Sequence, residues 1–413
     1  MLIRITGFWM HNNPLAPFSK LYLKYFIMKK SFFILYVMIA ITGCKEKDFN
    51  DDLQTLNPEP DKAISIRIHE LAQEIRIIEL DIPDGIFLGN TESIRVAGDY
   101  FILHDGLYSH SITVFDQTGK FVSQLSSIGR GPGEYLGSHA YAVIENNSII
   151  IVNDRGSKFL LYSFPKFEFI TSFEETRYFM SMESLDEPFV LTISDSRHNN
   201  DEYTGAELFN VDQKTFQRLE LPAKPAIIDL SYQNTLTRHS EGVYYSSPGF
   251  LTSVFDIGSD TVKKIVRIDF GKFNMPDEVW EWNSPERFET VFFENPKATW
   301  VQLFNKTSDY YSFFFLFSPE QQRFFSICNI ETSDCIVYNE IALFDSFSVL
   351  PAPIGLFDEY YITYLEPWQI KELVPEKYET ENVWENQLIN ARDMEKNILV
   401  LFTPIFPNDY YSK

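Results

Sequence analysis

The sequence is poor in the residues that most reactive sites require. Of its 413 residues, 3 are cysteine and 7 are histidine, and the histidines stand singly along the chain. It contains no Gly-x-Ser-x-Gly nucleophile elbow and no His-Glu-x-x-His zinc motif. Carboxylate pairs for glycoside hydrolysis cannot be singled out among 58 acidic residues. We therefore expect no metal and no cofactor, and a binding protein rather than an enzyme.

Basic residues are scarce as well. Lys and Arg number 35 against 58 Asp and Glu, which gives a net charge of −23 and a pI near 4.7. Holding nucleic-acid phosphates requires clustered Lys and Arg, so nucleic acid is excluded as the main partner. Hydrophobic residues at 45% and charged residues at 23% are typical of a folded chain. Aromatic residues reach 16%, which favours β-strands.

The one marked apolar run lies near the N-terminus and is too short to span a bilayer, which takes about 20 residues. Met28-Lys-Lys precedes the run Ser31–Ala40, and this pattern predicts a signal peptide over residues 28–43. The run ends in Ile-Thr-Gly-Cys44, which resembles the lipobox of bacterial lipoproteins. That resemblance implies a lipidated Cys44 and a membrane anchor. The alternative is an ordinary secretory signal that happens to end in a cysteine.

Two segments flank the signal peptide. Residues 1–27 have no place ahead of a complete export signal, so we expect translation to start at Met28. Residues 44–62 begin with the charged stretch Lys45–Asp52, which suits a tether. Similar runs behind the lipidated cysteine direct lipoproteins of Bacteroidetes to the outer face of the outer membrane, but a solvated linker is the simpler interpretation of the stretch. The protein is then anchored in the cell envelope, either periplasmic or exposed on the surface.

Residues 63–413 read as one all-β domain. Short runs rich in Ile, Val, Phe and Tyr alternate with turn residues from about Ile64 to Tyr364. The order of the runs repeats, because Asp105 and Asp154 follow equivalent strands 49 positions apart, about the length of a four-stranded blade. Weaker repeats bring the count to six, which predicts a six-bladed β-propeller. A pair of β-sandwiches is the alternative, but it does not require this period.

The two ends of the domain are expected to meet. Arg67–Leu80 is a strand-like run ahead of the first repeat, and Asn397–Phe402 is the last one in the chain. Pairing them completes the last blade and leaves no open edge.

Two segments break the β pattern. Residues 270–300 contain two helix starts, at Pro276 and Pro285, and are expected to form a helical insertion between blades. Residues 375–396 read similarly. Trp280 and Trp282 in the first insertion are candidate ligand contacts, although packing onto the propeller explains them as well.

Two cysteines lie in the mature domain. Cys328 and Cys335 are in two predicted strands joined by a Glu-Thr-Ser-Asp turn. This spacing allows a cross-strand disulfide in an exported protein. Two buried free thiols remain the alternative.

The most distinctive motif lies between two predicted strands. Its alternating glycines are compatible with an anion-binding loop, but the Gly-Lys-Ser/Thr of a phosphate-binding loop is missing and a strand rather than a helix follows. We therefore interpret it as a tight connection between blades, with its polar and aromatic residues as candidates for contact with a ligand. The motif consists of Gly129, Arg130, Gly131, Pro132, Gly133, Glu134 and Tyr135.

This motif resembles the Gly-x-Gly-Pro-Gly-Glu-aromatic signature of the six-bladed β-propeller lipoproteins of Bacteroides and related bacteria. The similarity extends to the lipobox, to Ile268–Lys272 followed by Met275-Pro276, and to a closing strand after an Asn. Tyr135 stands where Phe is usual. The resemblance implies the fold and the cell-envelope location, and it names no ligand.

One histidine group could carry chemistry. His104 precedes Asp105, and His110 and His139 lie in neighbouring loops. If these loops share one face, they could form a metal site or an acid–base pair. Ordinary loop histidines are the alternative.

These features together predict a binding or interaction module that presents one propeller face to a glycan, a peptide or an envelope protein. The second hypothesis is a hydrolase or lyase that acts on a glycan or peptide in the central channel. The third is a structural subunit of an outer-membrane complex, which predicts an extended apolar patch.

Overall fold

A computed structural model describes residues 53–407 except 145, 156–157, 195–204, 220, 222–234, 240–241, 247–252, 282–284 and 345–347, and it leaves the side chains of residues 280, 281, 285, 286, 288 and 289 undescribed. Residues 53–413 form one compact unit, separate from residues 1–52. The predicted signal peptide, Cys44 and the segment 1–27 lie outside the described residues. Within the described ranges, none of the helices has the length and apolar character needed to cross a bilayer.

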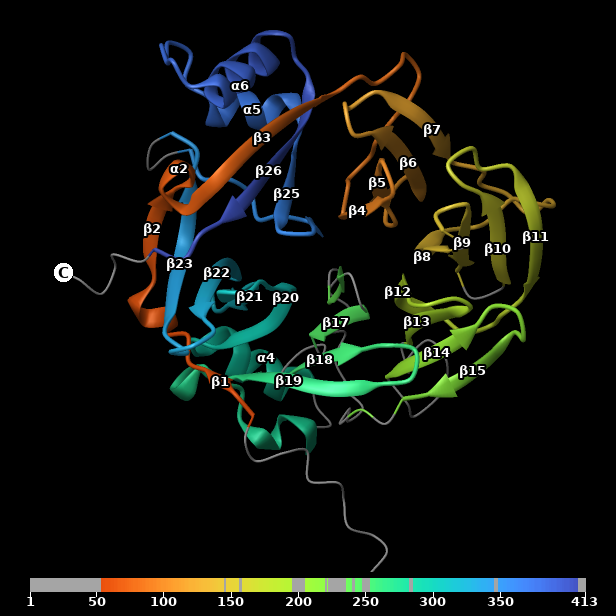
Figure 1. The fold of residues 1–413 in the computed structure, drawn as a ribbon, viewed down its shortest axis with the longest axis horizontal. Coiled ribbons are helices and arrows are strands. Elements are labelled where there is room, and N and C mark those ends of the chain that lie inside the picture. Colours follow the sequence, from red (N-terminus) through yellow and green to blue (C-terminus); the bar gives the residue numbers. More distant parts are fainter. Residues whose placement is uncertain are drawn as a thin grey trace, which may run out of the picture. The chain divides into compact units, whose positions relative to one another are not determined.

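The described chain is built from antiparallel four-stranded ladders that follow one another around a common centre (Figure 1). The first ladder contains β4 (Ser93–Ala97), β5 (Tyr100–Asp105), β6 (Ser111–Asp116) and β7 (Phe121–Leu125). The second contains β8 (Ser138–Ile144), β9 (Ile149–Asp154), β10 (Lys158–Ser163) and β11 (Phe169–Glu174). The third contains β12 (Phe179–Ser184), β13 (Phe189–Ser194), β14 (Ala206–Asn210) and β15 (Thr215–Arg218).

The remaining ladders follow the same plan. The fourth contains β16 (Leu236–His239), β17 (Gly242–Ser246), β18 (Ser253–Ile257) and β19 (Val262–Ile268). The fifth contains β20 (Ala298–Lys306), β21 (Tyr310–Phe317), β22 (Gln322–Asn329) and β23 (Cys335–Ala342). The sixth contains β24 (Gly355–Phe357), β25 (Tyr360–Leu365), β26 (Asn397–Pro404) and β3 (Ala72–Leu80). The all-β propeller predicted from the sequence is the observed fold.

The first and sixth ladders touch through their inner strands. β24 and β4 run parallel and share one residue pair, Gly355 and Ile94, which merges the two ladders into a single eight-stranded sheet. A Cβ atom at Gly355 would lie 2.5 Å from the carbonyl oxygen of Ile94. Only glycine allows the two backbones to approach this closely.

The N-terminal segment runs along three successive ladders. β1 (Thr55–Leu56) pairs with β19, and β2 (Ile64–Arg67) pairs with β23, both in parallel. The helical turns η1 (Pro60–Lys62) and α2 (Ile68–Leu71) lie between the strands. β3 then pairs with β26 from Leu80 opposite Asn397 to Ala72 opposite Pro404, as the sequence predicts. The structure differs from the predicted tether of residues 44–62, because the pairing of β1 places residues from 53 onward in the domain.

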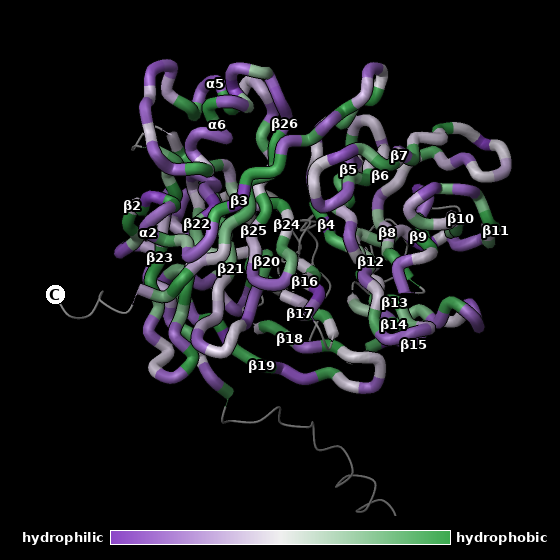
Figure 2. The backbone as a smooth tube through the Cα atoms, turned by 45° about the horizontal axis from the view of Figure 1, so that its top comes forward, coloured by the Kyte–Doolittle hydropathy of each residue, from purple (hydrophilic) through white to green (hydrophobic). Residues whose placement is uncertain are grey.

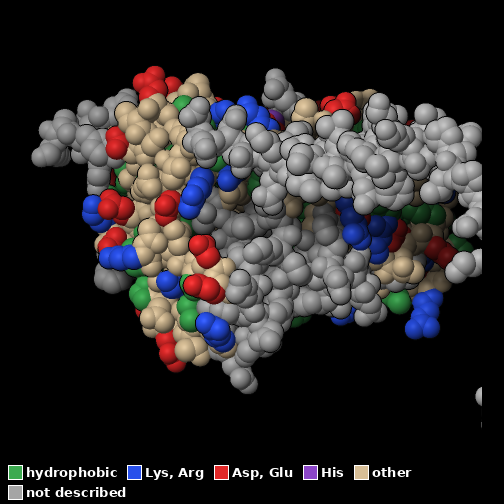
Figure 3. All heavy atoms as spheres, turned by 90° about the horizontal axis from the view of Figure 1, so that it is seen from below, with side chains coloured by type: hydrophobic (Ala, Val, Ile, Leu, Met, Phe, Trp, Pro, Cys, Tyr) green, Lys and Arg blue, Asp and Glu red, His purple; other side chains and the backbone are tan. Residues whose placement is uncertain are grey.

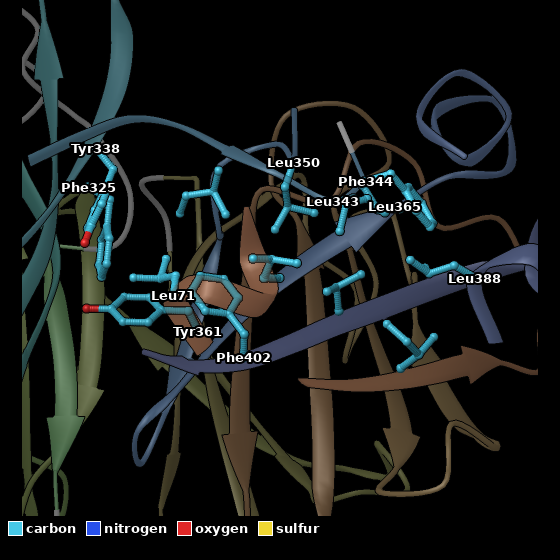
Figure 4. Packing of buried hydrophobic residues seen from close by; sticks show 14 of the residues in the cluster. Leu71, Phe325, Tyr338, Leu343, Phe344, Leu350, Tyr361, Leu365, Leu388 and Phe402 are labelled. Atoms are coloured by element: carbon cyan, nitrogen blue, oxygen red, sulfur yellow. The ribbon is translucent and has the colours of Figure 1, made fainter. Parts of the chain in front are cut away.

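Helices occur in the two segments where the strand pattern breaks. η2 (Gly271–Phe273), η3 (Asp277–Glu281) and α4 (Pro285–Glu294) connect the fourth and fifth ladders, within the predicted insertion of residues 270–300. α5 (Pro367–Leu373) and α6 (Val383–Asp393) lie between β25 and β26. Leu388 of α6 is fully buried against the fifth and sixth ladders (Figure 4).

Among the described residues, the core consists of six hydrophobic clusters, each formed mainly by the facing sides of two neighbouring ladders. The cluster of the second and third ladders is centred on Phe159, whose ring lies 5.1 Å from that of Phe209 and 5.5 Å from that of Phe179. Because side chains alternate across each strand, one ladder contributes to the cluster on either side of it. The hydrophobic stretches accordingly follow the strands in Figure 2. The last cluster joins the sixth ladder to the first and thereby closes the ring.

Candidate functional site

The inner strands of all six ladders line a cavity at the centre of the ring, with a volume of about 250 Å³. Its lining includes Gly98, Asn147 and Asp358, which lie in the turns from the inner to the second strand of the first, second and sixth ladders. We call this end of the ring the channel face. The opposite end, which carries the turns between second and third strands and the connections between ladders, is the motif face.

Two arginines and a glutamate meet in this cavity. Glu183 on β12 is 8% exposed, and its carboxylate lies 3.3 Å from Nη1 of Arg95 on β4 and 3.9 Å from Nη1 of Arg238 on β16. The guanidinium of Arg95 also donates to the carbonyl oxygens of Tyr141 and Met182 and stacks on the Tyr141 ring. These contacts join the first four ladders across the channel and compensate for the burial of the Glu183 charge.

The Arg238 side chain stands where this cavity meets a second one. It donates to the carbonyl and hydroxyl oxygens of Ser184 and remains half exposed. The second cavity, of about 790 Å³, lies between the turns of the second and third ladders. Both cavities are lined by Val143, Asn147, Ser184 and Arg238. The channel mouth and this groove therefore form one continuous site.

The groove is lined by polar side chains from three turns. Asn146 and Asn147 belong to the β8–β9 turn, Asp186 and Glu187 to the β12–β13 turn, and Asp212 to the β14–β15 turn. All five residues are exposed.

The predicted histidine group lies outside this site. His104 is fully buried, and its Nε2 lies 3.1 Å from both oxygens of Ser138. Burial lowers the pKa of His104 to about 4, with a further lowering contribution from the Arg95 charge. His110 and His139 lie with ring centroids 6.0 Å apart. In the part of the chain that the structure describes, no three His, Cys, Asp or Glu side chains gather to hold a metal ion.

The glycine motif forms the connection from β7 to β8 on the motif face. The carboxylate of Glu134 accepts a hydrogen bond of 2.7 Å from the Gly131 amide within the same loop. Tyr135 is fully buried, and its hydroxyl donates to the carbonyl oxygens of His110 and Leu125. These contacts tie the loop to the first ladder, which supports the interpretation of the motif as a connection.

Gly133 and Arg130 of the motif have different surroundings. Gly133 has φ +74°, and a Cβ atom there would lie 2.9 Å from the ring of Phe169. Arg130 is exposed. Neither Arg130 nor Pro132 is among the described residues that line the two cavities.

The two periodic aspartates have equivalent structural roles. Each ends the second strand of its ladder. The carboxylate of Asp105 accepts a hydrogen bond from the amide of Asn90 ahead of β4, and that of Asp154 accepts one from the amide of Leu136 ahead of β8. Asp105 also accepts from the amides of Tyr108 and Ser109 in the turn that follows it. Burial alone would raise the pKa of Asp105, but these hydrogen bonds outweigh it and lower the pKa. The 49-residue period therefore identifies aspartates that hold loops in place, and it does not identify a reactive site.

Cys328 and Cys335 face each other across the β22–β23 hairpin. Their sulfur atoms are bonded at 2.09 Å. The turn that they enclose is also bonded to Gln54. The side-chain amide of Gln54 donates hydrogen bonds of 2.6 Å to the carbonyl oxygen of Ile330 and of 3.0 Å to the hydroxyl of Ser333. The disulfide thus stands beside the point where the N-terminal segment joins the domain.

The remaining predicted contacts cannot be placed. Trp282 lies outside the described residues, and only the backbone of Trp280, in η3, is described.

Sequence reasoning did not select Arg95, Glu183 and Arg238. Each lies in the first strand of its ladder, Arg95 between two apolar residues and Arg238 next to His239. A charged residue in the innermost strand of three repeats was the available signal, and it becomes visible only once the repeats are aligned on their strands.

A solved structure from Bacteroides has a similar fold. A presumed exported protein from Bacteroides fragilis NCTC 9343 has a TM-score of 0.67 at 15% identity, over 86% of this chain and 100% of that chain. The WD40 repeats of RRP9 give a TM-score of 0.40 at 11% identity, over 81% and 99%, and the Neurospora crassa Pan2 WD40 domain gives 0.40 at 10%, over 77% and 76%. At such identities the likeness concerns the fold alone.

No curated protein matches this sequence. Residues 53–402 match a family described as a domain of unknown function, DUF4934. This range begins where β1 joins the propeller and ends within the closing strand β26. The chain belongs to the DUF4934 family.

Proposed function

We propose that this protein is a lipid-anchored binding module of the bacterial cell envelope that takes its ligand at the channel face. The export pattern over residues 28–43 and the lipobox-like Cys44 support the location, as does the likeness to an exported Bacteroides protein. The resemblance to the propeller lipoproteins of Bacteroides agrees with both. The anchor leaves the whole propeller in the aqueous phase, where its faces are accessible.

The continuity of the two cavities through Val143, Asn147, Ser184 and Arg238 carries this proposal. Together they offer an open, polar site large enough for a small ligand or a chain end. His104, His110 and His139 do not line either cavity as described, whereas His239, whose Nε2 lies 3.0 Å from Oδ1 of Asp256, lines the channel cavity. The binding hypothesis needs only the polar lining of the two cavities, whereas the hydrolase or lyase hypothesis would use His239 and Asp256 as its acid–base pair.

A ligand screen tests the proposal. The full chain, purified in detergent micelles, is titrated with glycans and peptides, and binding is followed by thermal shift and calorimetry. We expect a saturable ligand whose affinity falls when Arg238 is changed to Ala. Binding that is insensitive to every channel-face substitution would contradict the proposed site, and turnover of a bound ligand would favour the enzyme hypothesis.

The motif face supports a second function, docking of an envelope protein. Five large apolar side chains on its loops are between 46% and 73% exposed: Phe87, Leu107, Tyr108, Ile128 and Leu136. The hydrogen bond from Tyr135 to His110 and that from Gln124 to Phe87 connect these loops. Exposed apolar groups gathered in this way are typical of protein interaction surfaces.

Crosslinking in cells tests this second function. We expect a specific envelope partner to crosslink to the native protein and to be lost when Leu107 and Tyr108 are both changed to Ser. Unchanged crosslinking in that variant would contradict docking at this face.

A further inference from the structure

Charges of opposite sign alternate along the joined cavities. The channel part contains Arg95 and Glu183, Arg238 stands at the junction, and Asp186 and Glu187 stand on the groove. The same interspersion of acidic and basic side chains is visible on the side of the molecule in Figure 3, over its described part.

This alternation disfavours a ligand that carries charge of one sign. A polyanion that reaches Arg238 from the groove passes the carboxylates of Asp186, Glu187 and Asp212, which repel it. A polycation held by these carboxylates meets the guanidinium of Arg238 at the channel mouth. Since Arg238 already contacts Glu183 and Ser184, its charge is partly compensated before any ligand arrives.

Hydroxyl groups, in contrast, match every polar group of this lining. A hydroxyl donates to carboxylates such as Asp186 and Glu187, accepts from the guanidinium of Arg238, and can do both with the amides of Asn146 and Asn147. Phe189 also lines the groove and offers an apolar surface for the C–H face of a sugar ring.

We propose that the joined cavities bind an uncharged oligosaccharide, with the groove between the second and third ladders as the main subsite. This inference rests on the proposed function, because it names the ligand class of the same site.

The experiment compares three probes on the full chain in detergent micelles: neutral oligosaccharides, oligogalacturonate and oligolysine. Calorimetry is expected to detect the neutral sugars, with affinity changing less than about twofold between low and high salt, since screening does not weaken uncharged contacts. Asn147→Ala and Glu187→Gln are each expected to weaken binding by about tenfold. The matched control Glu379→Gln removes the same charge from an exposed position between α5 and α6 and is expected to bind as the native protein does.

The outcomes separate this inference from the proposed function. Salt-sensitive binding of oligogalacturonate or oligolysine that depends on Glu187 or Arg238 would overturn the ligand class and leave the binding site in place. Neutral sugars that bind Asn147→Ala and Glu187→Gln unchanged would overturn the location. If no neutral oligosaccharide binds at millimolar concentration to protein shown to be folded by circular dichroism, the inference is wrong.

Discussion

The two faces of the ring are built from different kinds of residue. At the channel face, charged side chains from three inner strands, Arg95, Glu183 and Arg238, meet in an open polar cavity. At the motif face, the loops close on buried groups such as Tyr135 and Asp105 and leave apolar side chains outside. One face thus has the features of a small-ligand site and the other those of a scaffold with a protein-docking surface. A distinctive sequence motif therefore need not mark the ligand site.

The largest expected effect comes from removing the central carboxylate of the channel. Glu183→Ala leaves Arg95 without its charged partner in a largely buried position, so we expect the free energy of unfolding to fall by about 4 kcal/mol. Urea denaturation measures this change. Glu187→Ala, on the exposed rim of the same face, is the control and is expected to have little effect. Equal losses in both variants would remove the distinction between channel and rim.

Lowering the pH is expected to reduce the stability of the motif face through His104. Its folded-state pKa of about 4 lies below the usual 6.5, so the unfolded chain takes up the proton first. The free energy of unfolding therefore falls as pH drops from about 6.5 to 4, by up to about 3 kcal/mol. The pKa of Asp105 is also lowered, so the free energy of unfolding falls further when the pH drops below 3.8, the usual pKa of this group.

Denaturation at a series of pH values measures this dependence. The variant His104→Gln is expected to flatten the profile between pH 6.5 and 4, because it removes the titrating group. A slope that persists in the variant would assign the pH dependence to other residues.

Loss of the disulfide is expected to weaken the outer edge of the channel face without changing ligand binding. Cys328 and Cys335 close a short loop. By restricting the unfolded chain, this closure is expected to stabilise the fold by about 2 kcal/mol. The double substitution to Ser is measured by thermal unfolding, with reduction of the native protein as a parallel test. Weakened binding at the channel mouth in this variant would show that the edge and the site are coupled.

An effect about as large as loss of the disulfide is expected in the motif loop, and a smaller one in its control. Gly133→Ala meets both an unfavourable φ and the Phe169 ring, which together cost about 2 kcal/mol. Gly271→Ala is the matched control, because its φ is +60° but nothing lies within 4 Å of the added Cβ. Only the backbone contribution of about 1 kcal/mol is expected there. Equal stability of the two variants would contradict the packing role of Gly133.

Much of the fold could be predicted from the sequence because it depends on local patterns. Strand runs, turn residues and the 49-residue spacing of Asp105 and Asp154 indicated repeated four-stranded units, and each aspartate indeed accepts a hydrogen bond from the connection ahead of its ladder. The pairing of the chain ends followed from the need to cover an open edge. The start of the domain was misplaced, because Thr55–Leu56 forms a strand only by pairing with β19.

The candidate site could not be predicted in the same way. The motif around Gly131 is conspicuous in the sequence, yet its groups are used within the loop. Arg95, Glu183 and Arg238 are separated by 55 or more positions, and no local pattern relates them.

By itself, the sequence determined the export pattern ending at Cys44, the strand periodicity and the hairpin that brings Cys328 opposite Cys335, because each depends on neighbouring residues. The tertiary structure alone decided which side chains share the channel. Ring closure by β3 and β26 sets the inner strands around one axis, and this arrangement brings charges from distant repeats within contact distance. The burial of Glu183 between Arg95 and Arg238 is a consequence of that closure.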